Sequence, residues 1–187
     1  MTVHAGRTAD PWRTSIATAT IALALLVGAC SSGGGSTDAT TPAKAQPARI
    51  DDVAPAIAAV EAARGGPQRY TEINANESVV NLFVARTDGT EIAYVYRDGK
   101  LDPPAEPTAQ QPGAIAFDLS SVDLGKVGGF HDLLKKDLPD AVLRRLTLVQ
   151  IPGKGLNWVA TVVNSKGSPI DVVFSPAGAL VGAVASP

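Results

Sequence analysis

The residue with the most distinctive chemistry in this chain is Cys30, the only cysteine among 187 residues. It follows an apolar run, 16–27, and precedes a polar, glycine-rich stretch, 31–36. The two residues before it, Gly28 and Ala29, are small and leave the backbone accessible to a peptidase. A cysteine thiolate is a strong nucleophile. This position therefore combines a reactive sulfur with an accessible point of cleavage.

The segment before Cys30 has the features of a secretory signal peptide over residues 1–29. Arg7 and Arg13 supply positive charge, and the apolar core that follows is roughly a dozen residues long. A permanent membrane-spanning helix needs about 20 apolar residues, so this core is too short for one. An ordinary secreted protein, whose single cysteine falls here by chance, is the alternative.

The sequence Val27-Gly28-Ala29-Cys30 resembles the lipobox of bacterial lipoproteins. The resemblance implies that the Cys30 sulfur becomes a thioether to diacylglycerol, and that cleavage before Cys30 makes it the mature N-terminus. Two or more acyl chains, such as palmitate, would hold the protein stably on the outer face of the cell membrane. The abundance of Ala, Gly, Val and Pro is typical of a GC-rich genome, such as that of an actinobacterium.

Composition narrows the class of partner. The formal net charge is only -2, with both signs interspersed, whereas a nucleic-acid-binding domain would carry a strong basic footprint. If Cys30 carries lipid, no disulfide can form, and packing alone must hold the fold. We therefore expect the membrane and an envelope protein as partners, with no nucleic acid and no cofactor.

The predicted mature chain keeps one histidine, His131, which favours a solvated or capping role. Metal sites use several His, Cys or clustered carboxylate ligands, and no such grouping is evident. A Ser-His-Asp triad or a nucleophile elbow also has no support in the spacing. We therefore predict no catalytic residue and no metal site. An envelope enzyme would need His131 in a cleft with a carboxylate or serine within reach.

The pattern of apolar residues predicts an α+β fold after a flexible tether, 30–49, with the folded domain over residues 50–187. Helical spacing is found in two segments, and alternation typical of strands in eight. A proline-rich connector, 102–114, lies between two groups of these elements. The expected helices are 50–64 and 130–138, and the expected strands are 69–74, 79–86, 91–96, 115–119, 143–151, 156–163, 170–174 and 179–185.

The two groups have the same order of helix and antiparallel meander, which predicts two tandem repeats packed as one domain. Repeat one covers about 50–101 and repeat two about 115–185. This order resembles that of PepSY-like and β-lactamase-inhibitor-protein-like domains, in pattern only, and the resemblance implies a binding or inhibitory module. The alternative is an accidental match, since a helix followed by a meander is a common local pattern.

Two sets of residues are candidates for binding a partner. The aromatic set is Phe83, Tyr94, Tyr96 and Trp158, and the basic set is Lys135, Lys136, Arg144 and Arg145. Aromatic side chains are favoured at interfaces, but Phe83 and Trp158 are better explained as core residues of the contacts between sheet and helix. The basic residues suit anionic headgroups or an acidic partner, and otherwise form a solvated face.

The expected function is therefore that of a lipid-anchored, non-catalytic protein-binding module of the cell envelope. The alternative is a carrier of a lipid or other amphiphile. A carrier needs an apolar cavity of about 300–1,000 Å³, whereas a binding module can be packed solid.

Overall fold

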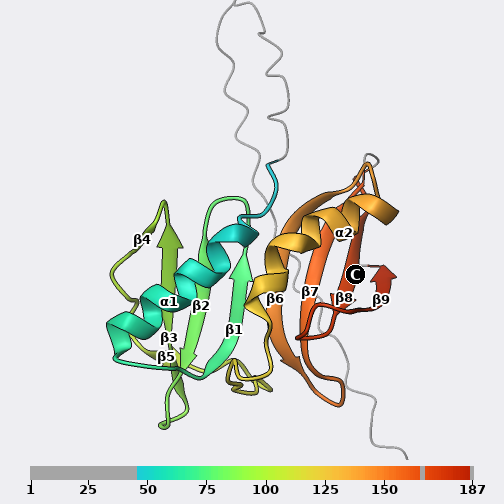
Figure 1. The fold of residues 1–187 in the computed structure, drawn as a ribbon. Helices are drawn as coiled ribbons and strands as arrows, with labels where there is room; N and C mark the ends of the chain where they lie inside the picture. Colours follow the sequence, from blue (N-terminus) through green and yellow to red (C-terminus); the bar gives the residue numbers. More distant parts are fainter. Residues whose placement is uncertain (1–45, 165–166, 186–187) are drawn as a thin grey trace, which may run out of the picture. The chain divides into compact units, whose positions relative to one another are not determined.

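The computed structural model describes residues 46–164 and 167–185, whose fold is shown in Figure 1. The expected signal peptide, the lipobox and most of the expected tether lie outside these residues. The described part is an α+β fold with two short α-helices and one nine-stranded antiparallel sheet, which confirms the predicted class. In chain order the elements are η1 (Ile50–Asp52), α1 (Val53–Arg64), β1 (Tyr70–Ala75), β2 (Val80–Ala85), β3 (Thr90–Arg97), β4 (Lys100–Leu101), β5 (Thr108–Ala109), η2 (Leu124–Gly129), α2 (Phe130–Asp137), β6 (Val142–Ile151), β7 (Gly155–Val163), β8 (Pro169–Phe174) and β9 (Leu180–Ala185).

The strands follow the spatial order β4-β3-β2-β1-β6-β7-β8-β9, and β5 pairs with β3 beside β4. The first strand of each group, β1 and β6, therefore meet at the centre, where Ile73 lies opposite Leu148. Figure 1 shows both α-helices on the same side of the sheet, α1 over β1–β3 and α2 over β6–β8. The second side of the sheet carries no helix in the described part of the chain.

Helix α1 forms as the sequence predicts. Its buried residues Val53, Ala56, Ile57 and Val60 recur at helical spacing and face the sheet. Pro55 lies in the first turn, where a missing backbone N–H costs nothing. Gly65 ends the helix in the left-handed region, with φ of 82°, and Gly66 N–H donates to the Glu61 carbonyl at 2.8 Å.

The folded part begins slightly earlier than the predicted boundary at residue 50. Ala48 is buried, and its N–H donates to the Leu143 carbonyl of β6 at 2.8 Å. The last residues of the predicted tether are thus part of the domain. Apolar spacing cannot detect this contact, because it is made mostly by the backbone.

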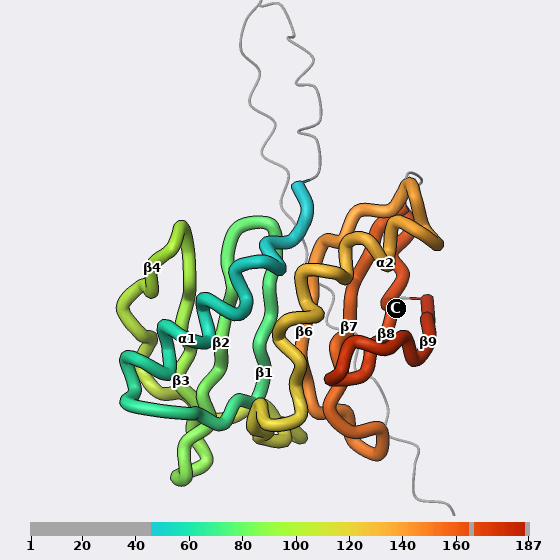
Figure 2. The backbone as a smooth tube through the Cα atoms, in the orientation of Figure 1, coloured from blue at the N-terminus to red at the C-terminus, as the bar shows by residue number. Residues whose placement is uncertain are grey.

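The proline-rich connector is extended and is fixed along the outer edge of β3. Ala105 N–H donates to the Ala93 carbonyl, and Gln110 N–H donates to the Gly89 carbonyl. The segment then crosses the end of the sheet and rises through η2 into α2, as Figure 2 shows. The strand expected over 115–119 is wrong, because only Phe117 forms a bridge there, to Tyr70.

Helix α2 is anchored to the sheet by three aromatic rings. Phe130 is fully buried and stacks on Phe174 of β8, with ring centroids 4.5 Å apart and planes 12° apart. It also meets Trp158 of β7 edge-on at 6.0 Å. Leu134 continues the buried stripe, but Leu133, which shares the apolar spacing of Phe130 and Leu134, is 47% exposed. Only part of the apolar stripe of α2 therefore reaches the sheet.

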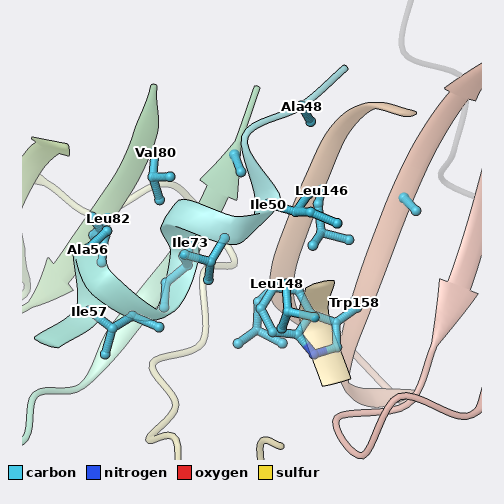
Figure 3. Packing of buried hydrophobic residues seen from close by; sticks show 14 of the residues in the cluster. Ala48, Ile50, Ala56, Ile57, Ile73, Val80, Leu82, Leu146, Leu148 and Trp158 are labelled. Carbon is cyan, nitrogen blue, oxygen red and sulfur yellow. The ribbon is translucent and has the colours of Figure 1, made fainter. Parts of the chain in front are cut away.

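One buried cluster runs through both groups of strands. Ile73 of β1, Leu148 of β6 and Trp158 of β7 belong to the same cluster, as Figure 3 shows. Burial alternates strictly along β2, where Val80, Leu82 and Val84 face the helices. The core is thus a single layer between the helices and one face of the sheet.

The two edges of the sheet differ in their protection. On the outer side of β3, the short strands β4 and β5 and the prolines of the connector cover the edge. At the other edge lies β9, Leu-Val-Gly-Ala-Val-Ala, which contains no charged residue and no proline. In the part of the chain that is described, no strand pairs with the outer side of β9.

Candidate functional site

The clearest candidate for a binding surface is an apolar groove between α2 and the edge strand β9, with a volume of about 470 Å³. Val172 and Phe174 of β8 form its floor, Leu133 and Leu138 line the helix side, and β9 forms the outer side. Lys136 and Asp137 supply the charged groups of the lining. We call this feature the α2–β9 groove.

The groove exists because the residues at the edge are small. The cross-strand partner of Val172 is Ala183, and the residue opposite Val173 is Gly182. The short side chain of Ala183 does not fill the space beside a helix that ends at Asp137. Gly178, with φ of 83°, turns the chain into β9 and lies against Lys126, where an added Cβ would come within 2.9 Å. The turn that positions β9 therefore requires glycine.

The surface beside the groove is unusually apolar for an exposed strand. Leu180, Val181 and Val184 are 61%, 63% and 58% exposed. A flat, uncharged edge strand offers its unpaired N–H and C=O groups to another extended chain, and proteins normally block such edges. Sequence reasoning missed this feature, although the uncharged segment 179–185 was a visible signal.

The aromatic residues proposed for partner binding are mostly in the core. Tyr94 and Tyr96 are only 5% and 8% exposed, and Trp158 is fully buried. Tyr94 and Tyr96 alternate with Ala93 and Val95, so they share the helix-covered face of β3. They therefore offer no exposed surface to a partner. Phe83 is half-buried on the opposite face, outside the core that was expected for it.

The structure separates the four basic residues that were predicted as one candidate surface. Lys135 and Lys136 are exposed on α2 and border two different pockets. Arg144 and Arg145 border a third pocket, of about 420 Å³, together with Asn74 and Thr161 of the helix-free face. Arg144 also forms an ion pair with Glu77 at 2.5 Å. These side chains do not gather into one patch.

His131 is half-buried at a pocket of about 590 Å³, which Lys135, Asp140 and Pro47 also line. Among the described residues, no hydrogen bond or ion pair joins it to a carboxylate or a serine. In the same residues, no group of three or more His, Cys, Asp or Glu is arranged to hold a metal ion. The predicted lipidation site Cys30 and its neighbours Val27–Ala29 lie outside the described residues.

The described helices also include none that is long and apolar enough to cross a membrane. Comparison of the chain with protein-family models, with curated proteins and with solved structures finds no match. Within residues 46–164 and 167–185, the α+β fold has one sheet edge that the connector covers and one edge, β9, that no described segment covers, with an apolar groove beside β9.

Proposed function

We propose that this chain is a lipid-anchored, extracytoplasmic protein-binding module without catalytic activity. The anchor rests on the sequence, where Val27-Gly28-Ala29-Cys30 resembles a lipobox and follows a short apolar signal. The binding activity rests on one observation, the uncharged edge strand β9 beside the α2–β9 groove. The partner would be an extended, apolar polypeptide segment in the cell envelope.

Strand addition at β9 accounts for both the uncharged edge strand and the apolar groove beside it. Main-chain hydrogen bonds from β9 would hold an incoming strand, and its alternate side chains would contact Leu180 and enter the groove. Leu133 gives the helix side a matching apolar contact. The opposite edge supports this reading, because the connector protects β3 from the same kind of pairing.

Site-specific photo-crosslinking in the producing cell tests this proposal. A photoreactive phenylalanine analogue at Val181 should give a discrete adduct with an envelope protein, and the same analogue at Thr87 in an exposed turn should not. The added change Val184→Pro, which removes an N–H from the edge strand, should abolish the adduct. Equal labelling from both positions would argue against strand addition at β9.

The anchor is tested separately by Cys30→Ala, which should release the protein from the membrane or leave it uncleaved. Detergent partitioning with metabolic fatty-acid labelling measures this directly. Label retained by the alanine variant would refute the lipidation of Cys30. This outcome is independent of whether β9 binds a strand.

An amphiphile carrier is the second candidate, and the size of the groove is the observation that favours it. About 470 Å³ falls within the 300–1,000 Å³ typical of ligand sites. Extraction of the purified protein followed by lipid mass spectrometry would recover a noncovalent lipid. Leu133→Asp should then remove that lipid without removing the Cys30 anchor.

We also propose that the two groups of elements are duplicated units, similar in pattern to PepSY-like and β-lactamase-inhibitor-protein-like domains. Asn81 and Asn157 take corresponding places in the second strand of each group, each followed by a buried residue, Leu82 and Trp158. Gly99 and Gly178 both turn the chain after a third strand with positive φ. These correspondences support a binding role by pattern, and they assign no residue a function.

A further inference from the structure

A second pocket lies on the helix-free face of the sheet and has a volume of about 340 Å³. Its floor includes Glu72 of β1, Phe83 of β2 and Val149 of β6, which are adjacent across the paired strands. One wall is the connector at 111–114, and the other is the turn after β6 at 150–152. The pocket therefore has a sheet floor and two loop walls from distant parts of the chain.

Glu91 of β3 is the unusual residue of this pocket, because its side chain is charged yet only 5% exposed. In the sheet, Glu91 is paired with the small residue Ala85 of β2. Its side chain reaches across β2 to β1, where Glu91 Oε2 accepts a hydrogen bond from the Thr71 hydroxyl at 2.5 Å. Among the described residues, nothing donates to its second oxygen, Oε1. Oε1 is not one of the buried polar atoms that lack a partner in the described residues, which are Tyr70 Oη and Trp158 Nε1, so solvent or a ligand can reach this oxygen and it is an open acceptor.

Glu72 supplies a second carboxylate whose position is fixed by its neighbours. Asn74 Nδ2 donates to Glu72 Oε1 at 2.6 Å, and Asn81 Nδ2 donates to Asn74 Oδ1 at 2.9 Å. The residues that line the pocket include these two glutamates and no lysine, arginine or histidine. The pocket thus carries two negative charges and no compensating positive charge in its described lining.

The ring of Phe83 makes an organic cation a better fit than a metal ion. An ammonium or guanidinium group is attracted to the face of an aromatic ring. Two carboxylates fall short of the six to eight oxygen ligands that calcium prefers, and the described residues hold no group of three metal-ligating side chains. A small alkyl chain would find apolar contact with Val149 and Pro152.

We propose that this pocket binds a small organic cation, a primary alkylammonium or alkylguanidinium. Its charged group hydrogen-bonds to Glu91 Oε1 and Glu72, and lies against the Phe83 ring. This site is separate from the α2–β9 groove, since the two share no lining residue. Its failure would leave the proposed function standing.

Titration of the full chain, purified in a nonionic detergent, with n-butylammonium and n-butylguanidinium tests the proposal by NMR. We expect saturable shifts in the amides of Glu72, Phe83 and Glu91, and at least tenfold weaker binding of the neutral n-butanol. Glu91→Gln should weaken binding by about tenfold or more, since hydrogen bonds to charged groups contribute this much.

The matched control is Glu106→Gln, which removes one negative charge from an exposed residue of the connector outside the pocket. It should leave binding within about twofold of the parent. If Glu91→Gln does not fold, Glu72→Gln and Phe83→Leu carry the same expectation of weakened binding. Equal binding of the alcohol, an equal loss in Glu106→Gln, or unchanged binding in the pocket variants would each overturn the proposal.

Discussion

Stacking between Phe130 and Phe174 is expected to hold α2 on the sheet, and a double-mutant cycle measures this contact. Phe130 is fully buried, and its ring lies 4.5 Å from that of Phe174 between centroids. Each change to leucine should lower the free energy of unfolding by about 1–3 kcal/mol, because ring atoms leave a closed core. The double variant should lose less than the sum of the two.

The expected coupling between Phe130→Leu and Phe174→Leu is about 0.5–1.5 kcal/mol, which is the range for aromatic pairs beyond simple burial. Guanidinium unfolding of the full chain in a nonionic detergent, followed by circular dichroism, provides the four free energies. Val84→Ala serves as the control partner for Phe130→Leu. It lies on β2, and β1 and β6 separate that strand from β7.

The control pair should add within about 0.5 kcal/mol, because residues that share no contact act independently. A coupling below about 0.3 kcal/mol for the aromatic pair would refute the stacking account. In that case, Leu134 and η2 would have to keep α2 in place on the sheet.

Three further predictions concern single positions. Gly178→Ala should cost about 1 kcal/mol more than Gly89→Ala, because both have positive φ but only the first would place a Cβ within 2.9 Å of Lys126; thermal unfolding compares them. Val181→Lys should change the unfolding free energy by less than about 0.5 kcal/mol while it abolishes the crosslinked adduct of a photoreactive residue at position 184, since the side chain is exposed. Burial, and secondarily the nearby Glu61, raise the pKa of the Tyr70 phenol above its usual value near 10. The unfolded chain therefore ionises at a lower pH than the folded chain, so the stability that this phenol contributes is complete below pH 10 and falls as the pH rises further. Tyr70→Phe should therefore lose less stability than the parent between pH 9 and pH 11, and an equal loss would contradict this assignment.

Much of the fold was predictable from local patterns. Val53, Ile57 and Val60 have helical spacing, and α1 forms there; the pairs Asp88-Gly89 and Asp98-Gly99 favour tight turns, and both flank β3 with a positive φ at the glycine. Such helices and turns can be predicted because each depends on a few neighbouring residues and on one backbone preference. The strand expected over 115–119 failed because only Phe117 pairs with Tyr70, while Ile115 is 43% exposed and no ladder of hydrogen bonds forms.

The candidate sites were much less predictable. Alternation with Ile92 and Tyr94 is consistent with the helix-free face for Glu91, but it does not predict that this side chain is only 5% exposed, beside the pocket residues 111–114. Leu133 keeps the apolar spacing of α2, yet the small residues of β9 leave it exposed above a groove. Both outcomes depend on the sizes of side chains on neighbouring strands, and a single element's periodicity contains no such information.

The proposed function depends first on the chemistry of Cys30, which decides where the folded domain is displayed. The most direct measurement is the intact mass of the N-terminal peptide of the protein isolated from its own cells. The account predicts a peptide that begins at Cys30 and carries a diacylglyceryl thioether. A free thiol with residues 1–29 still attached would contradict the anchor, and with it the placement of the α2–β9 groove in the cell envelope.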